Sequence, residues 1–478
     1  MSNVENIPTR TQGYADVLVG LQYGDEGKAK IIDLIAPEYD IIARFNGGAN
    51  AGHTIDTPYG RVVLQQIPSA VFHPEIMLYI GSGCAINAWK LRKEIELLES
   101  SAIDLTGRLI ISDRCAVVQP VHFLVDELNS SGIGTTKNGI GPCYADRAAR
   151  VRDGMRVNFQ LCDVLADPDS VLASMRKSME LQLARLEGDT TEQRLQLDGQ
   201  LNSLLECVER LRPYVETNRR FLTERVAGGA RVLFEGAQSV ELDVIHGDQP
   251  FVTSSHTVPA YAYVGGDLSP RYHRHTIGVA KAIVSRVGKG PFRSELGGER
   301  SERYFSDACA TGRGSAEEQA EFDPETLLAS ADPMDLGIAL RMMTGEYGAG
   351  TGRPRRIGIL DLSRLRDAVE TFGVNLVYLN KVDCLALYGR SSYQGIPVQL
   401  PPIAAGADPE IKVLPAFSAG GAGEDVPQEL PQELYAFKDV VEGALGVPVA
   451  GFGLGPERDN IAQFVRPDNH RPQGEETT

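Results

Sequence analysis

The sequence predicts an α/β protein with a large, mostly parallel central sheet flanked by helices. Two short apolar runs, 17–19 and 41–45, have the length and composition of buried strands, and each is followed by a Gly-rich loop. The first loop leads into an apolar helical stretch at 31–35. Further strand-like runs alternate with helical segments, which is typical of a parallel sheet. Ligands bind such sheets beyond the carboxyl ends of the strands, so we expect the two Gly-rich loops to face a ligand.

Two segments carry the clearest helical signals. Residues 84–100 form one predicted helix. Residues 170–215 repeat apolar side chains at spacings of three and four, with a break near Gly188. This pattern predicts two helices that pack as a hairpin and carry no chemistry. The remaining predicted strands are 231–234, 276–287, 357–360 and 374–379.

Two other segments lack a clear periodicity. Residues 297–344 are rich in Gly, Ser, Ala and acidic residues, and residues 404–431 mix Gly, Ala, Pro and acid. We expect both to be irregular surface insertions. The C-terminal tail, 467–478, is expected to be flexible.

The composition excludes several classes of protein. Asp and Glu number 64 against 47 Lys and Arg, so the net charge is −17, and 42% of the residues are apolar. The apolar fraction is that of a globular protein rather than a disordered one. The acidic balance argues against a general nucleic-acid binder, which needs a basic surface for phosphates. The chain also has 50 glycines, which often mark places where the backbone approaches a ligand.

The cysteines and the N-terminus indicate the compartment. The seven cysteines are scattered and form no CxxC pair, so neither a disulfide framework nor a thiolate metal site is expected. The chain nowhere has the run of roughly 18 apolar residues that a membrane span needs, and the N-terminus lacks the apolar core of a signal peptide. We therefore expect a soluble protein in the reducing cytoplasm, without a membrane partner.

The first Gly-rich loop has the features of an anion cradle. The backbone N–H groups of Gly24 and Gly27, with a helix N-terminus behind them and Lys28 nearby, suit a phosphate. The loop is not a Walker motif, because Ala29 occupies the place of the Mg²⁺-binding hydroxyl. Asp25 would repel a phosphate unless it holds a metal or takes a proton. The alternative interpretation is a plain helix cap with a tight turn.

The second Gly-rich loop, 46–54, adds amide donors at Asn46 and Asn50 and a titratable side chain at His53. A lone histidine is more often structural than catalytic, but few structural roles require so many glycines around it. Together the two loops supply a carboxylate, at Asp25, and an imidazole. Such a pair suits general acid–base catalysis.

Two later segments place hydroxyl groups beside glycines. Residues 134–142 carry two threonines and a lysine and are followed by Arg147 and Arg150, and residues 252–256 carry three hydroxyls. Hydroxyls beside backbone amides form ordinary phosphate sites, and plain turn chemistry is the alternative.

The C-terminal third holds two sharper motifs. Residues 350–356 place three arginines in four positions before a strand, and guanidinium groups pair carboxylates or phosphates bidentately. A solvated basic turn is the alternative. Residues 380–383 read Asn-Lys-Val-Asp at the end of an apolar strand, which is how guanine nucleotide-binding proteins present Asn-Lys-x-Asp. The carboxylate of Asp383 would accept from guanine N1–H and N2–H₂, which adenine lacks.

Taken together, these segments resemble the adenylosuccinate synthetase family, whose members make adenylosuccinate from IMP and aspartate with GTP. The matching segments run in order from residue 20 to residue 383, and they read GLQYGDEGKAKIIDLI, GGANAGHT, GTTKNGIGPCYADRAAR, LFEGAQSVELD, PFVTSSHT, SRVGKGPFRSEL, EYGAGTGRPRRIGILDL and NKVDCL. A weaker match follows at 453–456. The resemblance covers nearly the whole chain. It implies a P-loop-NTPase-like sheet in one catalytic domain, 14–466, with a helical insertion at about 165–225 and a loop insertion at about 297–345.

The resemblance also implies a two-step chemistry. Asp25 would remove N1–H of IMP and, with Gly52 C=O, bind one Mg²⁺ per subunit. His53 would donate to phosphoryl oxygens, and Gln238 completes the implied catalytic set. The activated O6 attacks the γ-phosphate of GTP and gives a 6-phosphoryl-IMP, and the amine of aspartate then displaces phosphate. This order makes chemical sense, because the purine O6 is a poor leaving group until it is phosphorylated. The products are adenylosuccinate, GDP and phosphate.

The implied ligand sites share several residues. GTP would bind Gly24, Glu26, Gly27, Lys28, Gly52, His53, Thr54, Arg355, Lys381, Asp383, Gly453, Gly455 and Pro456. IMP would bind Asp25, Asp33, Asn50, Thr135, Thr136, Arg150, Gln238, Thr253, Val287 and Arg353. L-Aspartate would bind Thr351, Gly352, Arg353 and Arg355. Arg150 would reach IMP from the other subunit of a homodimer, and nucleic acid is not an expected partner.

The chain departs from the family pattern at several points. Ala29 replaces a usual glycine, Lys137 and Asn138 replace a Gly-Arg pair, and Gly350 stands where threonine is common. The segment TVPAYAYVGGDLSP and the loop insertion also differ from ordinary members. Two alternatives stay open: a paralogue that acts on another purine monophosphate such as dGMP, and a guanine-nucleotide switch. Relatives that use dGMP typically replace the residue at Asp25, and a switch does not need the arginine motif.

Overall fold

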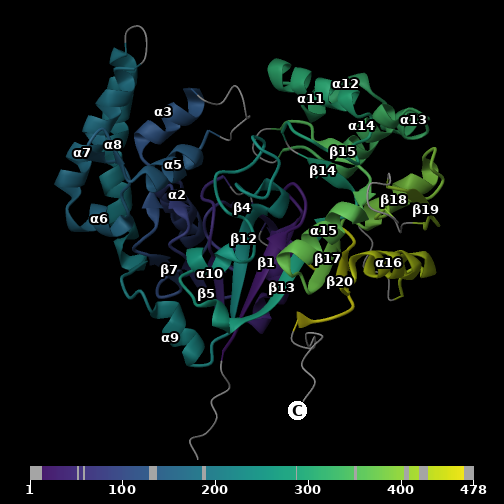
Figure 1. Cartoon of the computed structure of the whole chain (residues 1–478), viewed down its shortest axis with the longest axis horizontal. Coiled ribbons are helices and arrows are strands. Elements are labelled where there is room, and N and C mark those ends of the chain that lie inside the picture. The colour runs from purple at the N-terminus through teal and green to yellow at the C-terminus, as the bar shows by residue number, and fades with distance from the viewer. Residues whose placement is uncertain are drawn as a thin grey trace, which may run out of the picture.

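A ten-stranded sheet runs through the molecule, in the strand order β11-β7-β5-β2-β12-β1-β13-β17-β20-β21 (Figure 1). The computed structural model describes residues 13–50, 53–57, 60–128, 137–185, 190–286, 288–348, 352–402, 409–418 and 429–467, with the backbone alone for 53–57 and 60–62. The strands of the large sheet are β1 (Ala15–Gly20), β2 (Ile41–Arg44), β5 (Met77–Ile80), β7 (Leu109–Ser112), β11 (Val215–Glu216), β12 (Val232–Ser239), β13 (His273–Lys281), β17 (Leu376–Asn380), β20 (Val449–Gly453) and β21 (Ile461–Gln463).

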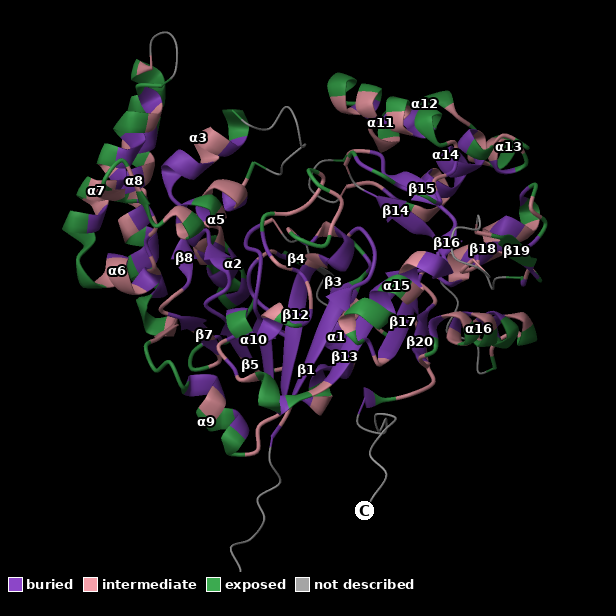
Figure 2. Cartoon of the chain, viewed as in Figure 1, coloured by how far each residue is buried: buried purple, intermediate pink, exposed green. Residues whose placement is uncertain are grey.

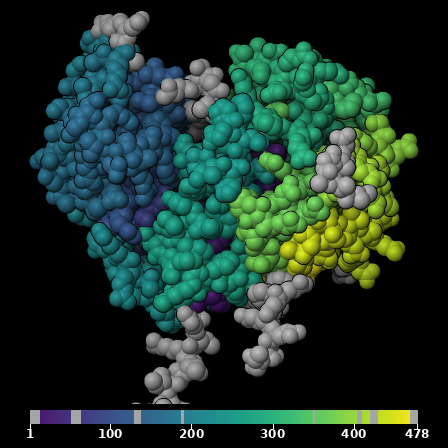
Figure 3. Space-filling view, in the orientation of Figure 1, coloured from purple at the N-terminus to yellow at the C-terminus, as the bar shows by residue number. Residues whose placement is uncertain are grey.

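The predicted parallel α/β sheet is confirmed. Every neighbouring pair in the large sheet is parallel except β20 with β21. The strands β1 and β17 are buried at every position, because an apolar cluster covers each face of the sheet. Burial on both faces explains why these strands read as continuous apolar runs rather than as an alternation. Figure 3 shows N-terminal residues on this face only as small purple patches between later segments.

Helices cover both faces and both ends of the sheet, and their exposed residues point away from it (Figure 2). The α-helices are α1 (Lys28–Ile35), α2 (Ala88–Ser100), α3 (Pro120–Leu128), α5 (Ile140–Ala149), α6 (Leu161–Ala166), α7 (Pro168–Leu183), α8 (Thr191–Leu211), α9 (Phe221–Ala227), α10 (Tyr261–Gly265), α11 (Glu299–Thr311), α12 (Ser315–Glu321), α13 (Pro324–Leu328), α14 (Pro333–Thr344), α15 (Leu362–Phe372) and α16 (Gln432–Leu445). Short 3₁₀ helices are η1 (Ala36–Glu38), η2 (Arg212–Tyr214), η3 (Val240–Leu242), η4 (Pro270–Tyr272) and η5 (Asp383–Arg390). The predicted helical hairpin is confirmed as α7 and α8, and its break at Gly188 lies outside the described residues.

Several smaller sheets are separate from the large one. Their strands are β3 (His53–Thr57) with β4 (Gly60–Leu64), β6 (Ala85–Ile86) with β8 (Ala116–Val117), β9 (Val151–Arg152) with β10 (Met155–Arg156), β14 (Val284–Arg286) with β15 (Arg356–Gly358), and β16 (Leu360–Asp361) with β18 (Ile396–Gln399) and β19 (Ile411–Leu414).

Three predicted elements are wrong in their extent. The predicted strand 276–287 is two strands, because the chain turns after Lys281 and β14 joins a different sheet. The predicted strand 357–360 is likewise shared between β15 and β16, and the predicted helix 84–100 begins with the short strand β6. An unbroken apolar run does not reveal where a chain turns inside a core, so periodicity alone could not place these breaks.

The expectation of an irregular surface segment at 297–344 is also wrong. This segment forms four helices, α11 to α14, and α14 buries Leu336, Ile338 and Leu340. Two of the helices begin at an Asp-Pro pair, where Asp323 and Asp332 cap the first turn. That pair is a sequence signal for a helix start, and it outweighs the polar composition of the segment. In the other predicted insertion, β19 is described, whereas 403–408 and 419–428 lie outside the described residues, as does the tail from 468.

The seven cysteines are all free thiols. In the part of the chain that is described, no helix combines the length and apolarity that crossing a membrane requires.

Candidate active site

The predicted site segments gather at the carboxyl ends of the central strands. The first Gly-rich loop follows β1, the second follows β2, and Gln238 ends β12. The Asn-Lys-Val-Asp motif follows β17. The segment 346–356, which we call the arginine loop, is described at 346–348 and 352–356, and its second part leads into β15 beside them. Figure 1 shows these strands ending toward the same upper side of the sheet. The parallel order of the sheet is what brings segments from both halves of the chain together.

The first Gly-rich loop folds around the buried carboxylate of Glu26. Its Oε1 accepts from the backbone N–H of Gln22 (3.2 Å) and Gly24 (2.8 Å), and the Ser239 hydroxyl also donates to it. Its Oε2 accepts from Lys28 Nζ at 2.8 Å. Burial alone would raise the pKa of Glu26, but Lys28 and its other donors hold that pKa below its ordinary value. The side chain of Glu26 therefore fixes the conformation of the loop through these hydrogen bonds.

The helix α1 begins directly at this loop. Gly27 caps it with a left-handed backbone (φ 80°), and a Cβ there would lie 2.7 Å from the amide nitrogen of Asn380. Asn380 Nδ2 donates to the backbone C=O of Glu26 at 2.7 Å, so the end of β17 fixes the loop in place. This arrangement leaves the N-terminus of an eight-residue helix behind a bare glycine, which is suited to a phosphate.

Asp25 projects from the loop toward the arginine loop. Its side chain is 40% exposed, and its Oδ2 accepts a 2.6 Å hydrogen bond from Arg355 Nη2. The other arm of Arg355 donates to Glu346 at 2.7 Å. Burial would lower the pKa of Arg355, but Asp25 and Glu346 raise it above its ordinary value. The two acids therefore hold this guanidinium charged between them.

Glu346 is the centre of a buried charge cluster. It is fully buried, and it forms ion pairs with Lys281, with Arg355 and with Lys381. The hydroxyl of Ser285 donates to it at 2.6 Å. Burial would raise its pKa, yet the three cations hold the pKa well below the ordinary value. Burial lowers the pKa of Lys281 in turn, and Glu346 opposes that shift.

Sequence reasoning missed Glu346 and Lys281. The available signals were a lysine at the end of an otherwise apolar strand and a glutamate directly before the arginine motif. A charged side chain that is buried needs a partner of opposite charge, so the presence of each of these residues could have predicted the other.

The second Gly-rich loop is tied to the end of β12. Asn46 exchanges two hydrogen bonds with the backbone of Ala237, at 2.9 and 3.1 Å. Asn50 accepts from the backbone N–H of Gly48 at 3.2 Å. Beside them lies Gln238, whose Oε1 is buried without a hydrogen-bond partner among the described residues. A Cβ at Gly47 would lie 3.2 Å from that oxygen, so the glycine leaves room for the amide.

The Asn-Lys-Val-Asp motif presents an unpaired acceptor. Burial raises the pKa of Asp383, and its Oδ1 is buried with no hydrogen-bond partner among the described residues. Lys381 donates to the C=O of Thr344 at 2.9 Å, besides its ion pair with Glu346. Gly453 packs so closely on Asn380 that a Cβ there would collide with it. Strand β20 therefore packs against the motif and helps to hold it in place.

Four predicted site residues have a left-handed backbone although they are not glycines. They are Asp25 (φ 56°), Arg150 (62°), Gln238 (57°) and Lys381 (60°). Such conformations cost about 1–3 kcal/mol each and persist where the surrounding structure enforces them, often at functional sites.

Other predicted residues are placed individually. Arg150 is exposed at the end of α5, and its side chain has no hydrogen bond or ion pair with the described residues. Thr253 is half-buried, with its N–H bonded to Leu242 C=O at 2.8 Å. Asp33 is buried, and its carboxylate pairs with His73 and Arg458 rather than with the groups around Asp25.

The remaining predicted residues fall into two groups. Gly455 adjoins Asn460, and its C=O accepts from Lys30 at 2.7 Å. Gly352 has φ 65°, and its N–H bonds Gly348 C=O at 2.7 Å. Pro456 is exposed in the turn after β20. Gly52, Thr135, Thr136, Val287 and Thr351, together with the side chains of His53 and Thr54, lie outside what the structure describes.

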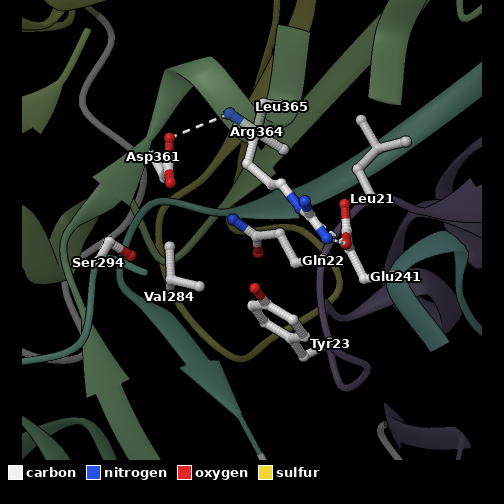
Figure 4. A pocket seen from close by; sticks show the side chains of 9 residues that line it. All are labelled: Leu21, Gln22, Tyr23, Glu241, Val284, Ser294, Asp361, Arg364 and Leu365. Carbon is white, nitrogen blue, oxygen red and sulfur yellow. Dashed lines mark hydrogen bonds and ion pairs between the residues drawn. The ribbon is translucent and has the colours of Figure 1, made fainter. Parts of the chain in front are cut away.

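A small pocket adjoins the start of the first loop, where Gln22 and Tyr23 line it (Figure 4). In it the carboxylate of Glu241 accepts from Arg364 Nε at 2.8 Å. Asp361 lines it too, with a pKa that burial raises. Tyr23 also lines it, and the guanidinium of Arg286 lies 4.6 Å from the centre of the Tyr23 ring. None of the predicted ligand residues lines this pocket.

Comparisons with known proteins match nearly the whole chain. The family model "Adenylosuccinate synthetase" matches residues 17–462. The chain belongs to the adenylosuccinate synthetase family. It is 54% identical over 452 residues to adenylosuccinate synthetase 2 of Cupriavidus pinatubonensis, covering 95% of this chain and 98% of that protein. It is 34% identical over 475 residues to the adenylosuccinate synthetase of Salinibacter ruber, covering 94% and 98%.

Solved structures agree with the family. The fully ligated adenylosuccinate synthetase of Plasmodium falciparum superposes with a TM-score of 0.75 at 26% identity, over 95% of this chain and all of that one. The succinoaminodeoxyadenylate synthetase of cyanophage S-2L, bound to dGMP and dATP, superposes with a TM-score of 0.58 at 18% identity, over 96% and 97% of the two chains. At that identity the second likeness shows the shared fold alone. Membership in the adenylosuccinate synthetase family makes the chain a C–N ligase of AMP biosynthesis that joins L-aspartate to IMP at the expense of GTP.

Proposed function

We propose that one cleft, between the first two Gly-rich loops and the arginine loop, carries out both steps of this ligation. The observation that supports it most directly is the 2.6 Å contact between Asp25 and Arg355. It joins the proposed base to the loop that would hold aspartate. Chemistry at the purine and binding of the amino acid would then share one cluster of charges.

In the first step Asp25 takes the proton from N1 of IMP. The negative charge moves to O6, which attacks the γ-phosphorus of GTP, and GDP leaves. Asp25 suits this role because its carboxylate is partly exposed at the loop surface and is oriented by a charged neighbour. His53 would donate to the phosphoryl oxygens, and the buried, unpaired Oε1 of Gln238 is an acceptor available to the purine. A 6-phosphoryl-IMP results.

In the second step the amine of aspartate attacks C6. The C6–O bond to the phosphoryl group breaks, and phosphate leaves with the electron pair. Arg353 and Thr351 would hold the carboxylates of aspartate, with Gly352 giving the loop its turn. Arg355 would lie between the two substrates, because it already contacts Asp25. Guanidinium groups suit this task, since they bind carboxylates in a fixed planar geometry.

Mg²⁺ fits the residues present as a metal shared with the nucleotide phosphates. Among the described residues no three His, Cys, Asp or Glu side chains form a cluster for a metal. Mg²⁺ is commonly held by one or two protein groups with the rest of its ligands from phosphate and water, and Asp25 with Gly52 C=O would supply that share. When bound, Mg²⁺ neutralises charge on the transferred phosphoryl group.

The remaining ligand assignments rest partly on the described residues and partly on the resemblance to the family. Asp383 Oδ1, buried and unpaired, is an acceptor for the N–H groups of guanine, and Lys381 would flank the base. Lys28 and the backbone of 24–28 would bind the GTP phosphates. Asn50 and Thr253 would contact IMP, with Thr135, Thr136 and Val287. Asp33 is a further proposed IMP contact, and its carboxylate also pairs with His73 and Arg458.

We also propose a homodimer of single-domain subunits in the cytoplasm. Arg150 supports it, because this exposed arginine has no ionic partner among the described residues of its own chain. In a dimer it would reach the 5′-phosphate of IMP in the other subunit. The single domain would span 14–466, since one sheet contains strands from both ends of it.

A steady-state assay with IMP, GTP, Mg²⁺ and aspartate tests the proposal. Adenylosuccinate absorbance should appear only when all four are present. Turnover with dGMP in place of IMP, and none with IMP, would establish the paralogue instead. GTP hydrolysis that needs neither the purine monophosphate nor aspartate would establish the switch.

A further inference from the structure

The helices α11 to α14 pack directly against the arginine loop. Figure 1 shows them grouped above β14 and β15, and both α11 and α14 contact β15. Gly314, just before α12, lies so close to the loop that a Cβ there would come within 3.1 Å of Gly352 C=O. This helical segment therefore packs along one side of the loop that carries Arg353.

A buried carboxylate holds this segment and the loop together. Glu318 of α12 is fully buried. Its Oε1 accepts from Arg341 Nη2 (2.6 Å) and from the Tyr304 hydroxyl (2.6 Å). Its Oε2 accepts from Arg341 Nε (3.0 Å) and from the Tyr347 hydroxyl (2.6 Å). Burial alone would raise the pKa of Glu318, but Arg341 and the two tyrosines hold it below its ordinary value. The carboxylate is ionised and accepts four hydrogen bonds.

Two of these contacts lead into the arginine loop, one at each end. Tyr347 is near the start of the loop and bridges across it to Pro354. Arg341 uses its remaining arm, Nη1, to donate to the backbone C=O of Arg355 at 3.1 Å. Inside the loop, Gly348 N–H bonds Arg353 C=O at 2.8 Å. The backbone that carries Arg353 and Arg355 is thus fixed at both ends to one carboxylate.

A fold that needed only stability would have no need of this charge. Replacing a buried ion pair by apolar side chains of similar volume is often neutral or stabilising. Here the pair is connected to the loop proposed to bind the substrate, and both of its connections end on that loop's backbone. Its role is therefore better explained by orientation than by stability.

We propose that Glu318 is a positioning residue for the amino-acid substrate. Through Tyr347 and Arg341 it sets the position of the arginine loop, and so of the guanidinium groups that grip the two carboxylates of aspartate. This inference rests on the proposed function of the arginine loop. It adds a determinant of aspartate binding that lies outside the segments expected to contact any substrate.

Two tyrosines offer a matched test. Tyr304→Phe and Tyr347→Phe each remove one hydroxyl that donates to Glu318 at 2.6 Å, but only Tyr347 belongs to the arginine loop. Both variants should lose similar thermal stability. Tyr347→Phe should raise the KM for aspartate on the order of fivefold, the effect of one lost hydrogen bond, with the KM values for IMP and GTP within about twofold. Tyr304→Phe should leave the aspartate KM within about twofold.

Glu318→Gln provides a stronger perturbation with the same expected direction. It should raise the aspartate KM by on the order of tenfold or more, because small misplacements of a binding group are costly. Glu325→Gln is the control, since Glu325 is an exposed residue of α13 that pairs only with Arg390 among described residues. It should match the unmodified enzyme in every constant. Should Glu318→Gln fail to fold, the comparison of the two tyrosine variants decides.

The outcomes distinguish the assignment of the arginine loop to aspartate from the positioning role of Glu318. If Arg353→Leu leaves the aspartate KM unchanged, the assignment of the arginine loop itself is overturned. If Arg353→Leu raises it but Tyr347→Phe and Tyr304→Phe give the same KM, Glu318 only stabilises the fold and its positioning role is overturned. A uniform rise of all three KM values in Tyr347→Phe overturns it as well.

Discussion

Arg355 donates a 2.6 Å hydrogen bond to Asp25, a residue 330 positions earlier in the chain. Its other arm donates to the buried carboxylate of Glu346 at 2.7 Å. This guanidinium therefore connects the first Gly-rich loop, after β1, to the arginine loop, before β15. A change on either side should therefore affect the other.

Replacing Asp25 with Asn should abolish product formation while GTP still binds. The amide keeps the shape of the side chain but cannot take the proton from N1, and loss of a general base costs about 10² to 10⁴ in rate. Adenylosuccinate absorbance measures the first effect, and titration with a GTP analogue measures the second. Retained turnover would remove Asp25 from the role of base.

Replacing Arg353 with Leu should raise the KM for aspartate more than the KM for IMP. A lost hydrogen bond to a charged group is worth about 1.5–3 kcal/mol, which corresponds to at least about a tenfold rise. Arg366→Leu is a suitable control, because Arg366 lies on the exposed face of α15 and pairs with Glu370. Equal effects of the two substitutions would show that bulk charge, rather than position, matters.

Replacing Asp383 with Asn should exchange the base that the enzyme prefers. The carboxylate accepts from two N–H groups of guanine, whereas an amide can donate to the 2-oxo group of xanthine. We expect kcat/KM for GTP to fall by on the order of a hundredfold and that for XTP to rise. The unpaired Oδ1 of Asp383 is the structural basis. Unchanged use of GTP by the variant would place the guanine elsewhere.

Replacing Glu346 with Gln should destabilise the fold even without ligands. It would leave Lys281, which is buried, without its counter-charge, and breaking a buried pair costs about 3–5 kcal/mol. Adding Lys281→Met to that variant should recover part of the loss. Melting temperatures of the apo proteins test both statements, and an equal loss in the single and double variants would contradict them.

Lys30 should make stability depend on pH in the alkaline range. Burial lowers its pKa from 10.5 to about 8, so the folded state disfavours the ammonium. Below pH 8 both states are protonated and the folded state carries the full penalty. Between pH 8 and 10.5 the unfolded chain binds more protons, so this group's contribution to stability rises with pH.

The variant Lys30→Met tests this dependence by removing the titrating group. The stability of the unmodified protein relative to the variant should increase by about 1–2 kcal/mol from pH 7 to pH 10, allowing for solvent screening. Melting temperatures across that range provide the measurement. A constant difference between the two proteins would mean that Lys30 titrates normally.

Much of the fold could be predicted because its strands are short apolar runs followed by glycines. Residues 17–19 lie on β1 and residues 41–44 form β2, and the loops after them reach the same end of the sheet. Local sequence encodes such features. The breaks after Lys281 and within 357–360 could not be predicted in this way, because both sides of each turn are equally buried.

The site was predictable to a lesser degree. Asp25, Asp383 and the arginines could be proposed from local motifs, which are visible in a single sequence, whereas Gln238 was implied only by the resemblance to the family. The Glu346 cluster and the Glu318 network depend on pairings between distant segments, and charge composition alone makes such residues look like solvated surface. Asp33 is a further example, because its pairing with the distant Arg458 could not be predicted from the sequence of its helix.

Residues of β20 and of the turn after it brace both the Asn-Lys-Val-Asp motif and the first Gly-rich loop. Gly453 C=O accepts from Val382 N–H at 3.0 Å, and Gly455 C=O accepts from Lys30 at 2.7 Å. Lys30 and Gly455 are 425 positions apart, so the first Gly-rich loop is synthesised long before the segment that braces it. A nascent chain therefore cannot complete these contacts until β20 has been made, and a chain released before that point would carry the first loop and the Asn-Lys-Val-Asp motif without the strand that braces them.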